Sequence, residues 1–308
     1  MSFAPRPRYE WKLRTRSLPL GVRTLVMGIL NVTPDSFSDG GHFFTPQDAP
    51  RRAVEHAMAM LDEGADVIDL GGESTRPGAA PITAEEEQQR VLPVLEEILR
   101  VRPSTIVSID TFHASTARLA IEAGAEIVND VSGHQWDSAM PSTCARLACG
   151  VVLMHTRGRP SEWRSLPPLE DDEVVPLVLT GLEANVAAAE NAGLYRSRIV
   201  IDPGFGFGKR MGENYPLLAN LSALHRLRLP ILVGVSRKSF LTRGLRRDTD
   251  AGGSATADVH ATTAANVAAI LAGAHVLRVH DVRPAVQAAS VADRILLRNQ
   301  TSRPDTTP

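Results

Sequence analysis

The sequence predicts a (β/α)8 barrel, also called a TIM barrel, formed by a single domain. Eight short apolar runs recur along the chain, and each breaks into a polar or glycine-rich cluster at its C-terminal end. Segments with helical periodicity separate the runs, which is the pattern of a strand, a loop and a helix repeated eight times. The active site of such a barrel lies where the strands end, so the eight clusters are where function is expected.

The expected strands follow one another at regular intervals. In chain order they cover residues 23–31, 65–70, 105–110, 125–130, 150–155, 198–202, 230–235 and 274–280.

Three helices between these strands have clear sequence signals. Residues 47–64 carry apolar residues at helical spacing and end on glycine, and residues 262–273 are alanine-rich and end in the same way. The residues Thr83-Ala-Glu-Glu have the form of a capping box at the start of a third helix.

Three segments do not fit this repeat. Residues 1–22 are expected to form a short N-terminal extension, and residues 299–308 a disordered tail. The polar residues 241–257 are expected to form a loop at or near the mouth of the site. The barrel itself then spans residues 23–298, which is close to the usual size of about 250 residues.

Composition excludes several classes of protein. The net charge of −2 and the pI near 6.5 argue against nucleic acid as a partner, because a phosphate-binding surface is usually basic. The N-terminus lacks the apolar stretch of a secretory signal, and the longest apolar runs are only long enough for strands. We therefore expect a cytoplasmic protein that does not bind a membrane.

The two cysteines, Cys144 and Cys149, are expected in one helix as ordinary buried thiols. No zinc-binding or hydrolase-triad motif occurs, so a metal is expected to arrive with a phosphorylated substrate.

Acceptor side chains gather at three strand ends. Asp110 and Asn129 end the third and fourth strands, and Asp202 begins the segment Asp-Pro-Gly-Phe-Gly-Phe-Gly-Lys after the sixth. That segment is neither a dinucleotide fingerprint nor a P-loop. Each of the three residues alone could simply cap the following loop, but a barrel points all three into one pocket. Together they suit the N–H donors of an aminopyrimidinone ring.

Cationic side chains gather at other strand ends. Arg76 follows the second strand, the segment 236–239 (Ser-Arg-Lys-Ser) follows the seventh, and Arg278 and His280 lie on the eighth. Arg278 and His280 alternate with apolar neighbours, so they share one face of the strand, toward the pocket or its rim. A phosphate or pyrophosphate would explain both residues.

These motifs resemble those of the dihydropteroate synthase family over nearly all of residues 23–297. The resemblance rests on the segments 27–41, 72–78, 108–111, 129–130, 202–209, 236–239 and 278–281. Segment 27–41, Met-Gly-Ile-Leu-Asn-Val-Thr-Pro-Asp-Ser-Phe-Ser-Asp-Gly-Gly, is close to diagnostic for the family.

The resemblance implies an alkyl-transferring enzyme of folate synthesis. The reaction condenses 6-hydroxymethyl-7,8-dihydropterin pyrophosphate with p-aminobenzoate to give 7,8-dihydropteroate and pyrophosphate. The implied catalytic residues are Asp35, Asp110, Lys238, Arg278 and His280. Mg²⁺ is the implied cofactor, sulfonamides are the expected inhibitors, and a homodimer formed through helices late in the barrel is the expected assembly.

The same resemblance implies three subsites. The pterin site comprises Asp110, Asn129, Met154, Asp202, Phe207, Lys238 and Arg278. The pyrophosphate site comprises Asn31, Thr75, Arg278 and His280, with Asn31 as the metal ligand. The p-aminobenzoate site comprises Thr75, Arg76, Pro77, Phe207, Lys238 and Ser239.

The first loop, residues 32–44, is expected to order over bound substrates and to bring Asp35 and Phe37 over the site. One position departs from the family pattern, because Thr156 stands where methionine is frequent, and this affects only the wall of the pterin pocket.

Two alternatives belong to the same barrel class. A corrinoid-type pterin methyltransferase would keep the pterin site but would lack the long first-loop motif. A non-catalytic pterin-binding homologue would have lost some of Asn31, Asp110, Lys238 and Arg278, and all four are present.

Overall fold

The computed structural model describes residues 3, 5–33, 49–74, 80–243 and 255–301. Within these ranges, ten strands occur, and eight of them form one parallel sheet. The eight are β3 (Leu25–Asn31), β4 (Val67–Gly71), β5 (Val107–Asp110), β6 (Ile127–Asp130), β7 (Gly150–Met154), β8 (Ile199–Asp202), β9 (Leu232–Val233) and β10 (Val276–Val279). Each lies within or overlaps one of the eight expected runs.

The sheet closes into a barrel. Its strands are ordered β8-β7-β6-β5-β4-β3-β10-β9, and a parallel bridge between Ile201 and Ile231 joins the two ends. The predicted eight-stranded barrel is therefore confirmed, and the seventh run contributes only the short strand β9.

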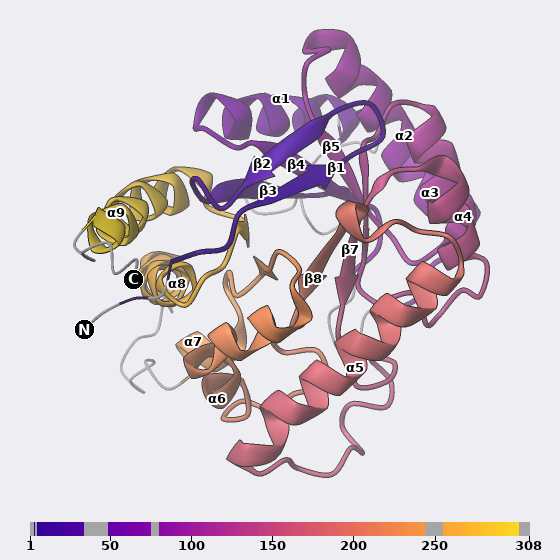
Figure 1. The fold of residues 1–308 in the computed structure, drawn as a ribbon. Helices are drawn as coiled ribbons and strands as arrows, with labels where there is room; N and C mark the ends of the chain where they lie inside the picture. Colours follow the sequence, from indigo (N-terminus) through magenta and orange to yellow (C-terminus); the bar gives the residue numbers. More distant parts are fainter. Residues whose placement is uncertain (1–2, 4, 34–48, 75–79, 244–254, 302–308) are drawn as a thin grey trace, which may run out of the picture.

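Helices surround the strands (Figure 1). The α-helices are α1 (Ala49–Asp62), α2 (Ala84–Val101), α3 (Ala114–Glu122), α4 (Met140–Leu147), α5 (Asp171–Asn191), α6 (Asn214–Ala219), α7 (Ser239–Thr242), α8 (Ala255–Leu271) and α9 (Val282–Thr301). Two 3-10 helices, η2 (Arg196–Arg198) and η3 (Leu221–Leu227), precede β8 and β9. At the start of α2, the Thr83 hydroxyl accepts from the Glu86 amide at 3.2 Å, which is the first half of the predicted capping box.

Alternation along the strands separates two cores. Ile68 and Leu70 on β4, like Leu277 on β10, belong to the large cluster that packs strands against helices. Val67 and Val276 have the opposite parity and belong to a second cluster inside the barrel. On each strand, the inward-facing positions that follow the residues of this inner cluster therefore lie nearer the carboxyl end.

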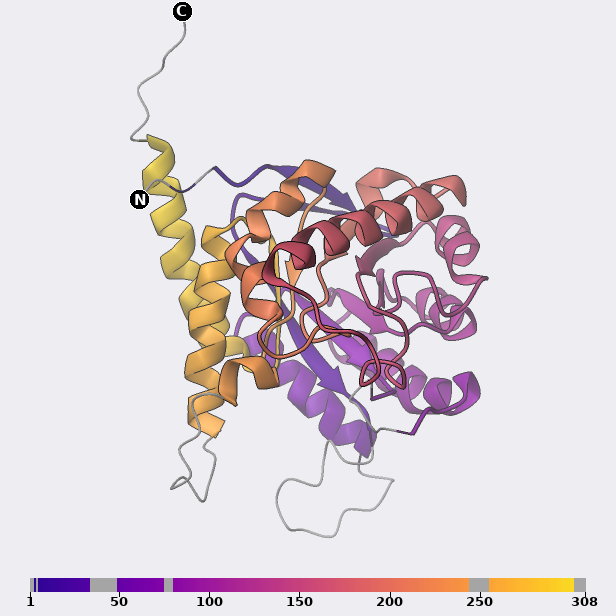
Figure 2. The same cartoon turned by 90° about the horizontal axis from the view of Figure 1, so that it is seen from below.

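The segment expected as an N-terminal extension closes the other end of the barrel. The strands β1 (Tyr9–Lys12) and β2 (Ser17–Leu20) form an antiparallel hairpin. Trp11, Leu13 and Leu20 are at most 2% exposed and join the inner cluster. Figure 2 shows the hairpin at the end of the barrel opposite to that toward which the strands point.

The structure differs from the sequence expectations at the C-terminal tail, in the loop after the seventh strand and at the two cysteines. Helix α9 continues to Thr301, three residues into the expected tail, since the first proline after it is Pro304. Helices α7 and α8 occupy both ends of the expected loop 241–257, and residues 244–254 lie outside the described ranges.

Cys144 and Cys149 are buried and free as expected, but they do not share a helix. Helix α4 ends at Leu147, because Ala148 adopts a left-handed conformation with φ of 52°, and Cys149 directly precedes β7.

Candidate active site

The inward positions of five strands bring four polar side chains and one methionine together at the carboxyl end of the barrel. Each of these positions lies two residues beyond an apolar residue of the inner cluster on the same strand. Side chains two residues apart on a strand share a face, so the five side chains also point inward. These positions are Asp69, Asn129, Met154, Asp202 and Arg278.

Arg278 lies between two carboxylates. Its Nε donates to Asp69 Oδ2 at 2.5 Å, and its other guanidinium nitrogen Nη2 pairs with Asp110 Oδ2. Asn129 Nδ2 donates to the same Asp69 oxygen at 2.9 Å. The Arg278 side chain is 20% exposed, so the two carboxylates do not enclose it completely.

Two glycines lie against these groups and show which of them are neighbours. A Cβ on Gly71 would lie 3.6 Å from both Asn31 Oδ1 and Asp110 Oδ2. A Cβ on Gly234 would lie 3.7 Å from Arg278 Cβ and 3.9 Å from Asp202 Oδ2. The structure thus brings Asn31, Asp110, Asp202 and Arg278 close together at the carboxyl end of the barrel.

Burial changes the protonation of the acids. Desolvation raises the pKa of Asp110 to about 7 although Arg278 opposes the shift, and it raises the pKa of Asp202 to about 6. Asp69 and Asp110 together raise the pKa of Arg278 against the effect of burial. At neutral pH the pocket therefore presents a fixed cation and carboxyl groups that titrate near neutrality.

Asp202 both caps a turn and faces the pocket. Its Oδ1 accepts from the Gly204 amide at 2.7 Å, while Oδ2 lies on the side of Gly234. The capping interpretation and the binding interpretation thus apply to the same side chain. Asp130 acts only as a cap, because it is fully buried and accepts from the amides of Ser132 and His134.

Lys238 and Phe207 form one wall of the pocket. The Lys238 ammonium lies 4.2 Å from the centroid of the Phe207 ring, and Trp163 meets that ring edge-on at 5.3 Å. Burial lowers the pKa of Lys238 to about 8, and Arg278 adds to the effect. Met154 is 4% exposed at the end of β7.

His280 and Ser239 lie at the rim. Both the amide and Nδ1 of His280 lie 3.1 Å from Ser236 Oγ, which ties this histidine to the loop after β9. Ser239 is exposed at the first residue of α7. Asp35, Phe37, Thr75, Arg76 and Pro77 lie outside the described residues.

Sequence reasoning missed two buried residues. Asp69 is fully buried and holds both Arg278 and Asn129, and its signal was a lone charge inside an apolar strand. Lys209 is 4% exposed at the end of the Phe-Gly-Phe-Gly segment, and the sequence motif alone indicates no role for it. A charged residue that cannot reach water needs a partner, which marks both positions.

The comparisons with known proteins agree with this arrangement. The family described as pterin binding enzyme matches residues 27–280. The dihydropteroate synthase of Escherichia coli strain K12 is 41% identical over 278 residues, which is 90% of this chain and 94% of the relative.

Two solved structures are similar over nearly the whole chain. Xanthomonas albilineans dihydropteroate synthase with 4-aminobenzoic acid is 38% identical, with a TM-score of 0.81 over 97% of this chain and 100% of that one. Yersinia pestis dihydropteroate synthase in a sulfonamide complex is also 38% identical, with a TM-score of 0.82 over 93% and 98% of the two chains.

The barrel, its polar pocket and the family match together define the class: the chain belongs to the pterin binding enzyme family. Within that family its near full-length relatives are dihydropteroate synthases, the transferases of folate biosynthesis, and the chain groups with them.

Proposed function

We propose that this protein condenses 6-hydroxymethyl-7,8-dihydropterin pyrophosphate with p-aminobenzoate, giving 7,8-dihydropteroate and pyrophosphate. The observation that carries the proposal is the set of side chains around Arg278, where acidic acceptors and cations meet at the strand ends. The relatives supply the substrate class, because one is solved with 4-aminobenzoic acid and another with a sulfonamide drug.

In this proposal the acids recognise the pterin. Asp110 and Asp202 accept N–H bonds from its aminopyrimidinone edge, and the Asn129 amide can accept or donate there. Each bond to a charged group contributes about 1.5 to 3 kcal/mol. Lys238 and Arg278 flank the ring, and Met154 and Phe207 supply apolar surface.

The pyrophosphate binds on the opposite side of the pocket. Thr75, Arg278 and His280 hold it, since Arg278 lies on β10 and His280 directly follows that strand at its carboxyl end. Asn31 Oδ1 would hold Mg²⁺ together with phosphate oxygens, because this amide oxygen lies beside Gly71 on the side of the Asp110 carboxylate and amide oxygens are suitable magnesium ligands. In the described residues no group of three His, Cys, Asp or Glu side chains could hold a metal by itself. Bound Mg²⁺ supplies charge neutralisation for the leaving pyrophosphate.

The p-aminobenzoate site lies toward Phe207, Lys238 and Ser239 and includes Thr75, Arg76 and Pro77. Asp35 and Phe37 close over it from the first loop. The variant Phe37→Ala should lower kcat/KM, and an unchanged value would remove this lid role.

We propose a dissociative, SN1-like path. The C–O bond to pyrophosphate breaks first, Arg278 and His280 stabilise the leaving group, and Asp110 and Asp202 favour the pterin cation. The amine nitrogen of p-aminobenzoate then forms the C–N bond and loses a proton to water or to the released pyrophosphate. It adds second because an arylamine is a modest nucleophile. Positional isotope exchange within the pyrophosphate in the absence of p-aminobenzoate supports this order, and its complete absence contradicts it.

The decisive experiment is pyrophosphate release with Mg²⁺, with and without p-aminobenzoate, with the product mass checked. Release that depends on p-aminobenzoate and yields dihydropteroate supports the proposal. Tight pterin binding without turnover contradicts it and favours the non-catalytic homologue.

A homodimer is part of the proposal. Helix α9 exposes Val291 at 59% and Ile295 at 41%, four residues apart on one face. We also propose a cytoplasmic location, which two free thiols suit. None of the helices in the described part of the chain is both long and apolar enough to cross a membrane.

A further inference from the structure

A buried lysine lies behind the pocket wall formed by Phe207. Lys209 is 4% exposed, and its ammonium donates to the carbonyls of Gly204 at 2.8 Å and Phe207 at 3.3 Å. The His155 carbonyl lies at 3.5 Å. Burial lowers the pKa of this lysine to about 7, which reflects the cost of keeping a charge away from water.

The two loops joined by this lysine are in close backbone contact. A Cβ on Gly204 would lie 1.9 Å from the His155 carbonyl oxygen, and one on Gly208 would lie 2.5 Å from Arg157 Cβ. Both glycines have φ near +70°, a conformation that glycine adopts without strain. The turn after β8 therefore rests directly on the segment after β7.

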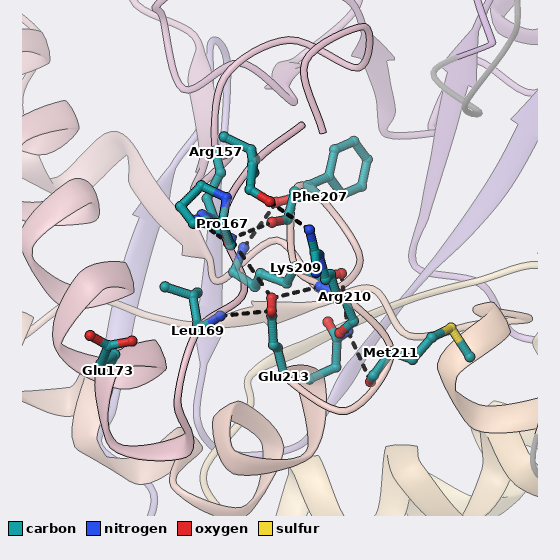
Figure 3. A network of polar contacts seen from close by, with 12 residues as sticks. Arg157, Pro167, Leu169, Glu173, Phe207, Lys209, Arg210, Met211 and Glu213 are labelled. Carbon is teal, nitrogen blue, oxygen red and sulfur yellow. Dashed lines mark hydrogen bonds and ion pairs between the residues drawn. The ribbon is translucent and has the colours of Figure 1, made fainter. Parts of the chain in front are cut away.

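A second set of polar contacts fixes the outer side of the same turn (Figure 3). Arg157 donates to the carbonyls of Gly208 at 3.1 Å and Pro167 at 3.0 Å. The Glu213 carboxylate accepts from the amides of Leu169 at 2.9 Å and Arg210 at 2.7 Å. These contacts hold the loops together but do not reach Phe207 itself.

The inner side of the turn has two anchors. Lys209 holds the carbonyl of Phe207, and Asn214 Oδ1 accepts from the Gly206 amide at 2.7 Å. The ring of Phe207 is left facing Lys238, at 4.2 Å, on the pocket side. The lysine thus fastens the backbone of the residue whose ring forms the wall.

We propose that Lys209 is a positioning residue for the p-aminobenzoate subsite. Its ammonium fixes the carbonyls of the Gly-Phe-Gly-Phe turn, and this sets where the Phe207 ring stands against Lys238. The inference rests on the function proposed above, since that function makes Phe207 and Lys238 part of the subsite.

The test compares Lys209→Met with Arg210→Met. The first removes the ammonium but keeps the chain length. The matched control removes the neighbouring cation, which donates outward to the Leu166 carbonyl at 2.6 Å. Lys209→Met should raise KM for p-aminobenzoate on the order of tenfold with kcat nearly unchanged, because a small displacement of a positioned group weakens its contact. Arg210→Met should leave KM within about twofold, like most surface substitutions.

Two further variants separate positioning from simple stability. Lys209→Gln keeps N–H donors and should recover part of the lost affinity. Asn214→Ala removes the other inner anchor and should also raise KM, which keeps the inference testable if Lys209→Met does not fold. Equal KM values for Lys209→Met and the wild-type protein, or an equal rise in Arg210→Met, would overturn the inference.

Trp163 gives a measurement that does not depend on turnover. Its indole touches the Phe207 ring, so the quenching of its fluorescence by iodide reports where that ring lies. For each protein, the contribution of Trp163 is the difference in fluorescence quenching between that protein and the same protein carrying Trp163→Phe. If the wild-type protein makes no dihydropteroate, the proposed function fails, and this signal alone decides the role of Lys209. A change in Lys209→Met that is absent from Arg210→Met supports it, and no change overturns it.

Discussion

The site depends on one arginine held by two acids. Arg278 meets Asp69 and Asp110, and Asn129 completes the set through Asp69. Removing one member of a buried charged pair leaves the other without compensation, which costs more than the pair contributes. The position of Arg278 therefore depends strongly on Asp69, although Asp69 is not among the residues proposed to contact a ligand.

The variant Asp69→Asn tests this. The amide has no negative charge to balance the Arg278 guanidinium, so the free energy of unfolding should fall by about 1 to 3 kcal/mol, and kcat/KM should fall on the order of tenfold or more. Asp281→Asn is the control, because Asp281 pairs with the exposed Arg237 and its loss should cost less than about 1 kcal/mol. Chemical denaturation and steady-state kinetics measure both quantities. Equal effects of the two variants would contradict the role of Asp69.

The carboxyl groups predict how binding depends on pH. Asp202, with a pKa of about 6, offers both oxygens as charged acceptors for N–H donors only when it is ionised, because the protonated carboxyl turns one of them into an O–H donor. The Kd of a neutral pterin analogue should therefore rise by up to about tenfold per pH unit below this pKa. Calorimetry from pH 5 to 8 measures this, and Asp110, with a pKa of about 7, steepens the change. Asp202→Asn should bind weakly with a flatter profile, and a Kd that is constant across this range contradicts the assignment.

Stability changes with pH in the opposite direction. The folded protein holds protons on Asp110 and Asp202 at pH values where the unfolded chain has released them. Their contribution is present below about pH 4 and is lost as the pH rises through about 6 to 7. The pocket therefore binds best in the ionisation state that stabilises the fold least.

At the scale of elements, the hairpin β1–β2 seals one end of the barrel while the site occupies the other. Trp11 is fully buried and its indole donates to the Arg198 carbonyl at 2.8 Å. Arg6, 5% exposed, joins the preceding segment to Asp293 of α9 at 2.9 Å. This segment is thus part of the barrel core and not an appendage.

The variant Trp11→Ala should lower the free energy of unfolding by about 3 to 5 kcal/mol, because it leaves a cavity under the inner cluster. Glu10→Ala on the same strand should change it by less than about 0.5 kcal/mol, since that side chain is exposed. Thermal unfolding measures both. The kcat of folded Trp11→Ala should stay near the wild-type value, and a specific loss of kcat would show that the hairpin reaches the site.

At the scale of the whole molecule, the exposed apolar face of α9 predicts self-association. The double variant Val291→Glu and Ile295→Glu should convert a dimer to a monomer, because charge on both faces of a symmetric contact repels. Light scattering after size exclusion measures the mass. Val101 on α2 is also exposed, at 46%, so Val101→Glu is the control and should leave the mass unchanged. A monomeric wild-type protein would refute the homodimer.

The sequence by itself determined the barrel and much of its pocket. Strand periodicity and polar strand ends are local signals, so Asp110, Asn129, Asp202 and Arg278 could be placed at the carboxyl end of the barrel before any contact was known. Helix boundaries were less certain, as the extra turn of α9 shows, because fraying and capping depend on neighbouring residues.

Only the tertiary structure decided which residues support that pocket. Asp69 and Arg278 are 209 positions apart, and they meet because closure of the barrel brings β10 against β3, next to β4. Lys209 gains its role from the two loops that close around it, and Trp11 from the open barrel end that it fills. Periodicity tells which way a side chain points, but its partner depends on which distant segments the folded chain places opposite it.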